Sequence, residues 1–158
     1  MIENLWKIYE ANKEWIKFAD TKAIAFIAII GVLFNFLYSI KDKFICLSNY
    51  HIFKILYFGS FGLLALSLLC SVYCLLPRTS KTNIVDNNVI YYKAINDNFK
   101  DEKEYYNAIK DAKKNFGEQL SIQNYQLAKV ATKKYSIVRV SLILFSLGFL
   151  AILIIILG

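Results

Sequence analysis

The stretch WIKFADTKAIAFIAII, residues 15–30, sets the architecture, because a polar helical segment changes within it into a run suited to lipid. Asp20 and Lys22 stand immediately before that run. Charged groups at the mouth of a membrane helix are costly, so their presence needs a reason. Three interpretations are open: a plain anchor at the membrane surface, a structural ion pair, or part of a binding site.

Three apolar segments are long enough to cross a membrane. Hydrophobic residues make up 57% of the 158 residues and charged residues 20%, which is typical of a membrane protein with a substantial water-exposed part. The first span is predicted at 23–40 and reaches about 27 Å, just enough for the hydrocarbon core. The second, 55–77, carries no charge and ends at Pro77, and the third, 137–157, carries only Arg139.

The distribution of basic residues predicts the orientation. Fifteen of the 19 Lys and Arg residues lie in residues 1–22 and 78–136, and three lie in the short link 41–54. Basic segments stay on the cytoplasmic side, which predicts a cytoplasmic N-terminus, an external link and an external C-terminus. Residues 1–10 lack the features of a secretory signal peptide, so the first span is expected to act as its own insertion signal.

The two cytoplasmic segments are predicted to be helical. Residues 1–22 carry apolar side chains every three or four positions, which is typical of an amphipathic helix on a membrane surface or on a partner helix. Residues 84–99 are predicted as one helix and 101–135 as another, with Gly117 as a weak point. The expected fold class is an all-α membrane protein with three transmembrane helices and a cytoplasmic helical extension. A monomer of three spans is too thin to enclose a water path, so a homo-oligomer is also expected.

No constellation for catalysis or metal binding is evident. The sequence has one histidine, His51, interpreted as an exposed residue of the external link, and no nucleophile, phosphate-loop or zinc motif. We therefore expect no enzyme activity, no cofactor and no metal. Cys70 and Cys74 are expected to be small packing residues of an apolar helix. The lysines alternate with acidic residues in KDEKEYYNAIKDAKK, which disfavours a nucleic-acid polymer as the partner.

The remaining candidate site is at the cytoplasmic membrane surface, where the ends of all three spans meet. The candidate ligand-binding residues are Asp20, Lys22, Arg78, Lys134, Tyr135 and Tyr92. A planar guanidinium suits a phosphate or carboxylate, and an aromatic ring can stack on a base. The alternative is structural: Asp20 pairs with Arg78 or Lys134 and holds the helices together, while Lys22 and Tyr135 lie at the lipid headgroups.

Within the spans, three polar residues are candidates for contacts between helices or for the lining of a pore: Asn35, Ser60 and Ser67. Such residues more often hydrogen-bond across helices than line a channel, so the structural role is favoured. No ion selectivity is predicted from them.

At the same residues the chain resembles a known family, the transmembrane effectors of Pycsar antiphage defence. The resemblance rests on WIKFADTKAIAFIAIIGVL, with its A-D-x-K-A pattern, on CLLPRTS, on the aromatic stretch NVIYYKAI, and on LSIQNYQLAKVATKKYSIV. These pieces cover most of the chain in the family's order. By position, the resemblance carries over Asp20, Lys22, Arg78, Lys134 and Tyr135 as signature residues.

The resemblance implies a function. Such effectors respond to cyclic CMP or cyclic UMP made during infection and then impair the inner membrane, which stops growth before phage matures. The lipid bilayer, the cyclic pyrimidine mononucleotide and further copies of the chain are the expected partners. Two alternatives stay open: a membrane effector that responds to another cyclic nucleotide or oligonucleotide, and a membrane scaffold that is not gated.

Overall fold

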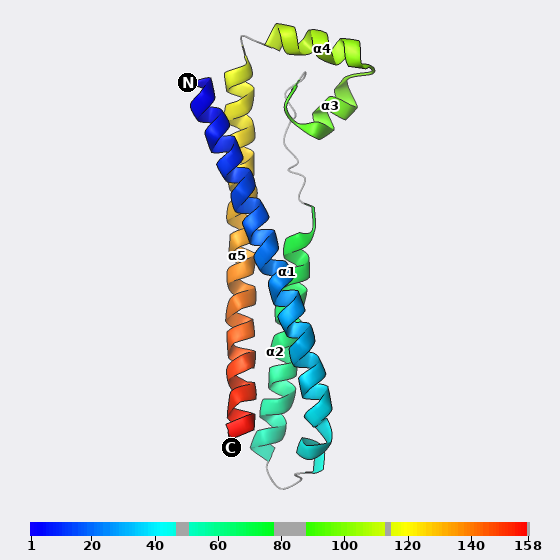
Figure 1. Cartoon of the computed structure of the whole chain (residues 1–158), viewed down its shortest axis with the longest axis vertical. Coiled ribbons are helices and arrows are strands. Elements are labelled where there is room, and N and C mark those ends of the chain that lie inside the picture. Colours follow the sequence, from blue (N-terminus) through cyan, green and yellow to red (C-terminus); the bar gives the residue numbers. More distant parts are fainter. Residues whose placement is uncertain (47–50, 78–87, 113–114, 158) are drawn as a thin grey trace. The chain divides into compact units, whose positions relative to one another are not determined.

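The structure is a computed structural model that describes residues 1–46, 51–77, 88–112 and 115–157 (Figure 1). Of these residues 92% are helical and none lies in a strand, which confirms the expected all-α class. The helices are α1 (Ile2–Cys46), α2 (His51–Leu75), α3 (Tyr92–Asn98), α4 (Glu102–Asp111) and α5 (Phe116–Leu157). Three of them, α1, α2 and α5, are long and apolar enough to cross a membrane.

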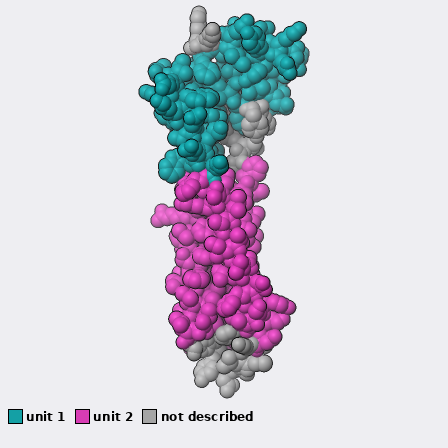
Figure 2. All heavy atoms as spheres, viewed as in Figure 1, with its two compact units in different colours: residues 1–17, 78–132 teal, residues 18–77, 133–158 magenta. Residues whose placement is uncertain are grey.

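The chain divides into two compact units (Figure 2). Unit 1 consists of residues 1–17 and 78–132, and unit 2 of residues 18–77 and 133–158. The helices α1 and α5 contribute residues to both units. The predicted membrane boundaries within these helices stay predictions.

Unit 2 is a bundle of α2 with the apolar parts of α1 and α5 (Figure 1). Along α1 the buried residues Ala19, Ala23, Ile30 and Leu37 recur at intervals of four and seven, which places them on one face of the helix. This face packs against α2 and α5 in a core of Ile30, Leu37, Tyr57, Leu64, Ile152 and Ile155. Burial of this apolar stripe therefore fixes which side of α1 faces its neighbours.

The contact between α2 and α5 is polar at its centre and close-packed near the C-terminus. Ser141 Oγ lies 2.9 Å from Ser67 Oγ and 2.8 Å from Ser71 Oγ, and all three residues are fully buried. Further along, a Cβ built on Gly148 would meet Leu64 Cγ at 3.2 Å. Small residues thus let the two backbones approach, as is usual for helices in lipid.

Unit 1 joins the first part of α1 to the first part of α5 through side-chain amides. Asn12 donates to the carbonyl of Asn124 at 3.3 Å, and Asn124 donates to the carbonyl of Leu5 at 2.8 Å. The first part of α1 therefore packs on a partner helix within its own chain, one of the two roles expected for residues 1–22.

The helix predicted at 84–99 is wrong in its first part. The structure describes the chain from Asn88, and the helix α3 begins at Tyr92; residues 84–87 lie outside the described residues. The side-chain oxygen of Asn88 accepts from the backbone N–H groups of Ile90 and Tyr91 at 2.9 and 3.0 Å. Such a local turn competes with helical hydrogen bonding, so the helix starts only after it.

The single helix predicted at 101–135 is also wrong, because α4 ends at Asp111 and α5 begins at Phe116. Gly117, the predicted weak point, is the second residue of α5 and lies just past the break. The start of α4 is well defined: Asp101 accepts from the backbone N–H of Glu104 at 2.7 Å, and Glu104 accepts from that of Lys100 at 2.9 Å. The arrangement differs from a capping box in one respect, because Glu104 accepts from Lys100, the residue before the N-cap Asp101.

Candidate functional site

The predicted site contains an ion pair within unit 2. Lys134 of α5 donates its ammonium to Asp20 Oδ1 of α1. The Lys134 side chain is 6% exposed and that of Asp20 31% exposed. The cation is therefore shielded from water by the protein, whereas the carboxylate keeps partial access to solvent.

Small side chains surround the pair and allow the three helices to approach. Ala19, Ala23, Cys74 and Val138 form a buried cluster beside it. Cys74 of α2 donates through its thiol to the carbonyl of Lys134 at 3.9 Å. The pair thus lies where α1, α2 and α5 pack together, and it joins α1 to α5.

Lys22 lies near Tyr135, the residue that follows Lys134 in α5. The Lys22 ammonium is 4.5 Å from the ring centroid of Phe18 and 5.8 Å from that of Tyr135. Lys22 is exposed and Tyr135 is half-buried. Of the two predicted cations that the structure describes, Lys22 is therefore more accessible to solution than Lys134.

The other two predicted ligand-binding residues are not placed by the structure. Arg78 lies outside the described residues, and Tyr92 is the first residue of α3 but its side chain lies outside the described part. The structure therefore brings together four of the six predicted residues, Asp20, Lys22, Lys134 and Tyr135.

The three intramembrane candidates differ in their surroundings. Ser60 is buried and donates to the carbonyl of Tyr57 in its own helix at 2.8 Å. Ser67 of α2 hydrogen-bonds to Ser141 of α5. This is the kind of contact between helices that the sequence favoured over the lining of a pore. Asn35 lies on the exposed side of α1, away from the other helices of the described chain.

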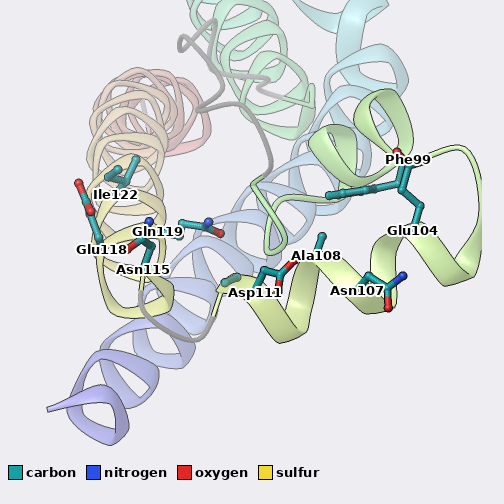
Figure 3. Close-up of a pocket in the computed structure, with 10 residues that line it drawn as sticks. Phe99, Glu104, Asn107, Ala108, Asp111, Asn115, Glu118, Gln119 and Ile122 are labelled. Carbon is teal, nitrogen blue, oxygen red and sulfur yellow. The ribbon is translucent and has the colours of Figure 1, made fainter.

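A second candidate site, missed by sequence reasoning, is a pocket of about 470 Å³ in unit 1 (Figure 3). Its volume falls within the range of about 300–1,000 Å³ usual for small-molecule sites. The lining comes from α4, from the start of α5 and from the turn after α3: Phe99, Glu104, Asn107, Ala108, Asp111, Ala112, Asn115, Glu118, Gln119 and Ile122.

The charge of this pocket disfavours an anionic phosphate. Among the described lining residues, Glu104, Asp111 and Glu118 are acidic and none is Lys or Arg. Gln119 is held in place because its side-chain oxygen accepts from the backbone N–H of Val89 at 3.1 Å. The amides of the pocket can hydrogen-bond to the edge of a base, and its one aromatic ring can stack on the face of a base. The phosphate of a nucleotide would need cations from outside the described lining.

The stretch GEQLSIQNYQ next to this pocket is dense in amides, of which Gln119 lines the pocket. Gln119, Gln123 and Asn124 are each more than 90% buried, although amides are usually exposed. Asn124 Oδ1 is buried without a hydrogen-bond partner among the described residues. Within the same described residues no group of His, Cys, Asp or Glu has the arrangement of a metal site.

The sequence of the chain matches one family. Residues 4–158 match the Pycsar effector protein domain, PycTM. The chain belongs to the Pycsar effector family. The Pycsar effector protein SaPycTM of Staphylococcus aureus is 34% identical over 141 residues, which cover 89% of this chain and 84% of the relative. No solved structure matches the chain.

The resemblance inferred from the sequence is therefore confirmed. The chain is a Pycsar transmembrane effector of antiphage defence, with three helices able to span a membrane. Pycsar effectors of this type are not a known enzyme family.

Proposed function

We propose that this effector responds to cyclic CMP or cyclic UMP on the cytoplasmic side and then impairs the inner membrane, which causes growth arrest or cell death. Membership of the Pycsar effector family carries this proposal. The three membrane-spanning helices supply the means of acting on the bilayer. The orientation, with a cytoplasmic N-terminus and an external C-terminus, is proposed from the 15 basic residues in segments 1–22 and 78–136.

The ion pair of Asp20 and Lys134 is proposed to be a latch of the resting state. Through this pair Asp20 of α1 binds Lys134 of α5, and the lysine side chain is shielded from water. A buried cation that loses its partner is strongly disfavoured, so the pair resists separation of the two helices. A ligand changes this balance only if it binds the separated arrangement more tightly than the paired one.

The nucleotide is proposed to bind residues that are not already committed to the latch. Lys22 is exposed and lies near Tyr135, so it is available to an anion. Arg78 and Tyr92 stay candidates from the sequence pattern. The acidic pocket of unit 1 is proposed to contact at most the base, because its described lining residues include three carboxylates and no Lys or Arg.

The decisive experiment uses the purified full-length protein in dye-loaded liposomes. Cyclic CMP or cyclic UMP is expected to release dye, and cyclic AMP serves as the control ligand. Absence of dye release with either pyrimidine nucleotide, despite correct insertion, contradicts gating by these ligands. Calorimetry on the same protein separates binding from gating, because a protein that binds but does not leak retains the sensor and lacks the proposed effect.

A single variant tests the site. Arg78→Ala is expected to weaken nucleotide binding at least tenfold, since a bidentate contact to phosphate is lost. Lys100→Ala, which removes an exposed cation outside the signature, is the matched control. Unchanged binding in a well-folded Arg78→Ala protein removes Arg78 from the site.

A further inference from the structure

One polar side chain in the first predicted span faces away from the bundle. Asn35 is exposed on α1, whereas Ile30 and Leu37 on either side of it in sequence are fully buried in the core. The Ser39 hydroxyl is satisfied, because it donates to the carbonyl of Asn35 at 2.9 Å. The Asn35 side-chain amide itself has no hydrogen bond to any described residue, so α1 presents an unsatisfied carboxamide within the apolar run.

An unsatisfied amide is unfavourable at this position. The run 23–40 is apolar apart from a few residues and spans the hydrocarbon core, where no water replaces a missing partner. Polar side chains of membrane helices therefore hydrogen-bond to neighbouring helices. Among the described residues no helix covers this face of α1, which leaves it open to a partner from outside the chain.

The neighbouring residues on this face leave room for another helix. Ala28, Gly31, Asn35 and Ser39 recur every three or four positions and lie on one side of α1. A Cβ built on Gly31 meets no atom within 4 Å, so packing inside this chain does not require the glycine. A helix that approached here would meet small or polar side chains at these four positions, with the exposed side chains of Ile24 and Val32 beside them.

We propose that α1 binds the α1 of a second copy of this chain through the face formed by Ala28, Gly31, Asn35 and Ser39. Copies inserted in one membrane share the same orientation and depth, so Asn35 of one copy meets Asn35 of the other. A carboxamide has both donor and acceptor groups, so two identical amides satisfy each other. Asparagine pairs of this kind specify parallel two-helix contacts in coiled coils.

The chemistry favours a second copy over a lipid molecule. An acyl chain offers no hydrogen-bond partner for the amide, and the headgroups lie at the ends of the run. The other exposed glycines, Gly59 and Gly62 of α2, also have open space around a built Cβ, but α2 has no exposed carboxamide beside them. The inference goes beyond the proposed function, because it requires only that α1 spans the membrane and needs no nucleotide.

Disulfide cross-linking of the full-length protein in native membranes tests the proposal. In a chain whose three cysteines are replaced by alanine, Gly31→Cys and, separately, Val32→Cys report on the proposed face, and Phe58→Cys reports on the exposed side of α2. Oxidation with copper phenanthroline is expected to give a covalent dimer with the α1 reporters at least fivefold more than with Phe58→Cys. Equal yields, or products with the mass of a different protein, overturn the proposal.

The role of the amide is tested in the same background. Adding Asn35→Leu to Val32→Cys is expected to lower the dimer yield at least fivefold, whereas Asn35→Gln, which keeps a carboxamide, retains at least half of it. Phe36→Leu, a change at a neighbouring exposed residue, is the control and is expected to leave the yield unchanged. An unchanged yield with Asn35→Leu, in protein that unfolds at the same temperature as its parent, overturns the role of Asn35.

Discussion

Lys134 of α5 and Asp20 of α1 stand 114 positions apart in the chain, and their ion pair joins the two helices in unit 2. The two partners are unequally buried, since the lysine side chain is 6% exposed and the aspartate side chain 31% exposed. Loss of the aspartate therefore leaves a buried cation, whereas loss of the lysine leaves a carboxylate that water still reaches. Substituting Asp20 and substituting Lys134 are therefore expected to change stability by different amounts.

This asymmetry gives the first prediction. Asp20→Ala is expected to destabilise the folded protein by about 3 kcal/mol, and Lys134→Met by less, because the more buried charge is the costlier one to leave unpaired. The double variant is expected to recover part of the loss. Thermal unfolding in detergent micelles, arranged as a double-mutant cycle, measures all three values.

The chain contains a matched control for this cycle. Lys7 and Glu3 also form an ion pair, at 2.8 Å, but their side chains are 69% and 80% exposed. Lys7→Met is expected to change stability by no more than about 0.5 kcal/mol, since exposed pairs contribute little. Equal losses for Lys7→Met and Asp20→Ala contradict the argument from burial.

The second prediction concerns the serine contact between α2 and α5. Ser141→Ala removes the hydroxyl that Ser67 and Ser71 share, and is expected to cost about 1 kcal/mol of stability. Ser146→Ala, at an exposed position of the same helix, is expected to have almost no effect. Thermal unfolding in micelles compares the two variants, and a larger loss with Ser146→Ala contradicts the assignment.

The third prediction concerns close approach at Gly148. The Cβ of Gly148→Ala meets Leu64 Cγ at 3.2 Å and Leu63 Cβ at 3.3 Å, so the neighbours must move. We expect a loss of about 1 kcal/mol from overpacking, and a larger loss with Gly148→Leu. Gly62→Ala enters open space and is expected to be neutral or slightly stabilising. The order of the three unfolding temperatures checks this prediction.

The fourth prediction concerns the wall of the pocket in unit 1. Gln119→Leu leaves the backbone N–H of Val89 without its acceptor, at an expected cost of about 1–3 kcal/mol. Hydrogen exchange is the measurement, since the amide of Val89 is expected to lose protection while amides of α2 keep theirs. The control, Ser121→Ala, alters an exposed residue two positions away. Unchanged protection at Val89 would show that this hydrogen bond does not hold the wall.

The membrane helices were predictable because their signal lies in the sequence itself. Long apolar runs specify helices in lipid whatever their neighbours are. The ion pair of Asp20 with Lys134 was one of the alternatives drawn from the sequence, because a lone acidic residue at the mouth of a span needs a cation nearby. That Lys134 faces Asp20 depends on which side of α5 is buried, and that is a property of the packed bundle.

The water-exposed helices were harder to predict because their ends depend on local competition. The side chain of Asn88 accepts from the backbone N–H groups of Ile90 and Tyr91, so α3 starts only after this turn. The spacing of apolar residues gives no sign of such a turn. Gly117 was the only sequence feature that indicated a break between Asp111 and Phe116. The pocket exists only because α4 and α5 are separate helices. The prediction of one continuous helix over residues 101–135 therefore left no place for a pocket.

Within unit 2 the ion pair of Asp20 and Lys134 fixes the register of α1 against α5. A slide of one turn, about 5.4 Å, would bring apolar side chains opposite other apolar side chains, but it would separate the two charges and leave the buried ammonium without its carboxylate. The apolar core therefore sets which faces of the two helices meet, and the ion pair sets how far along each other the helices lie.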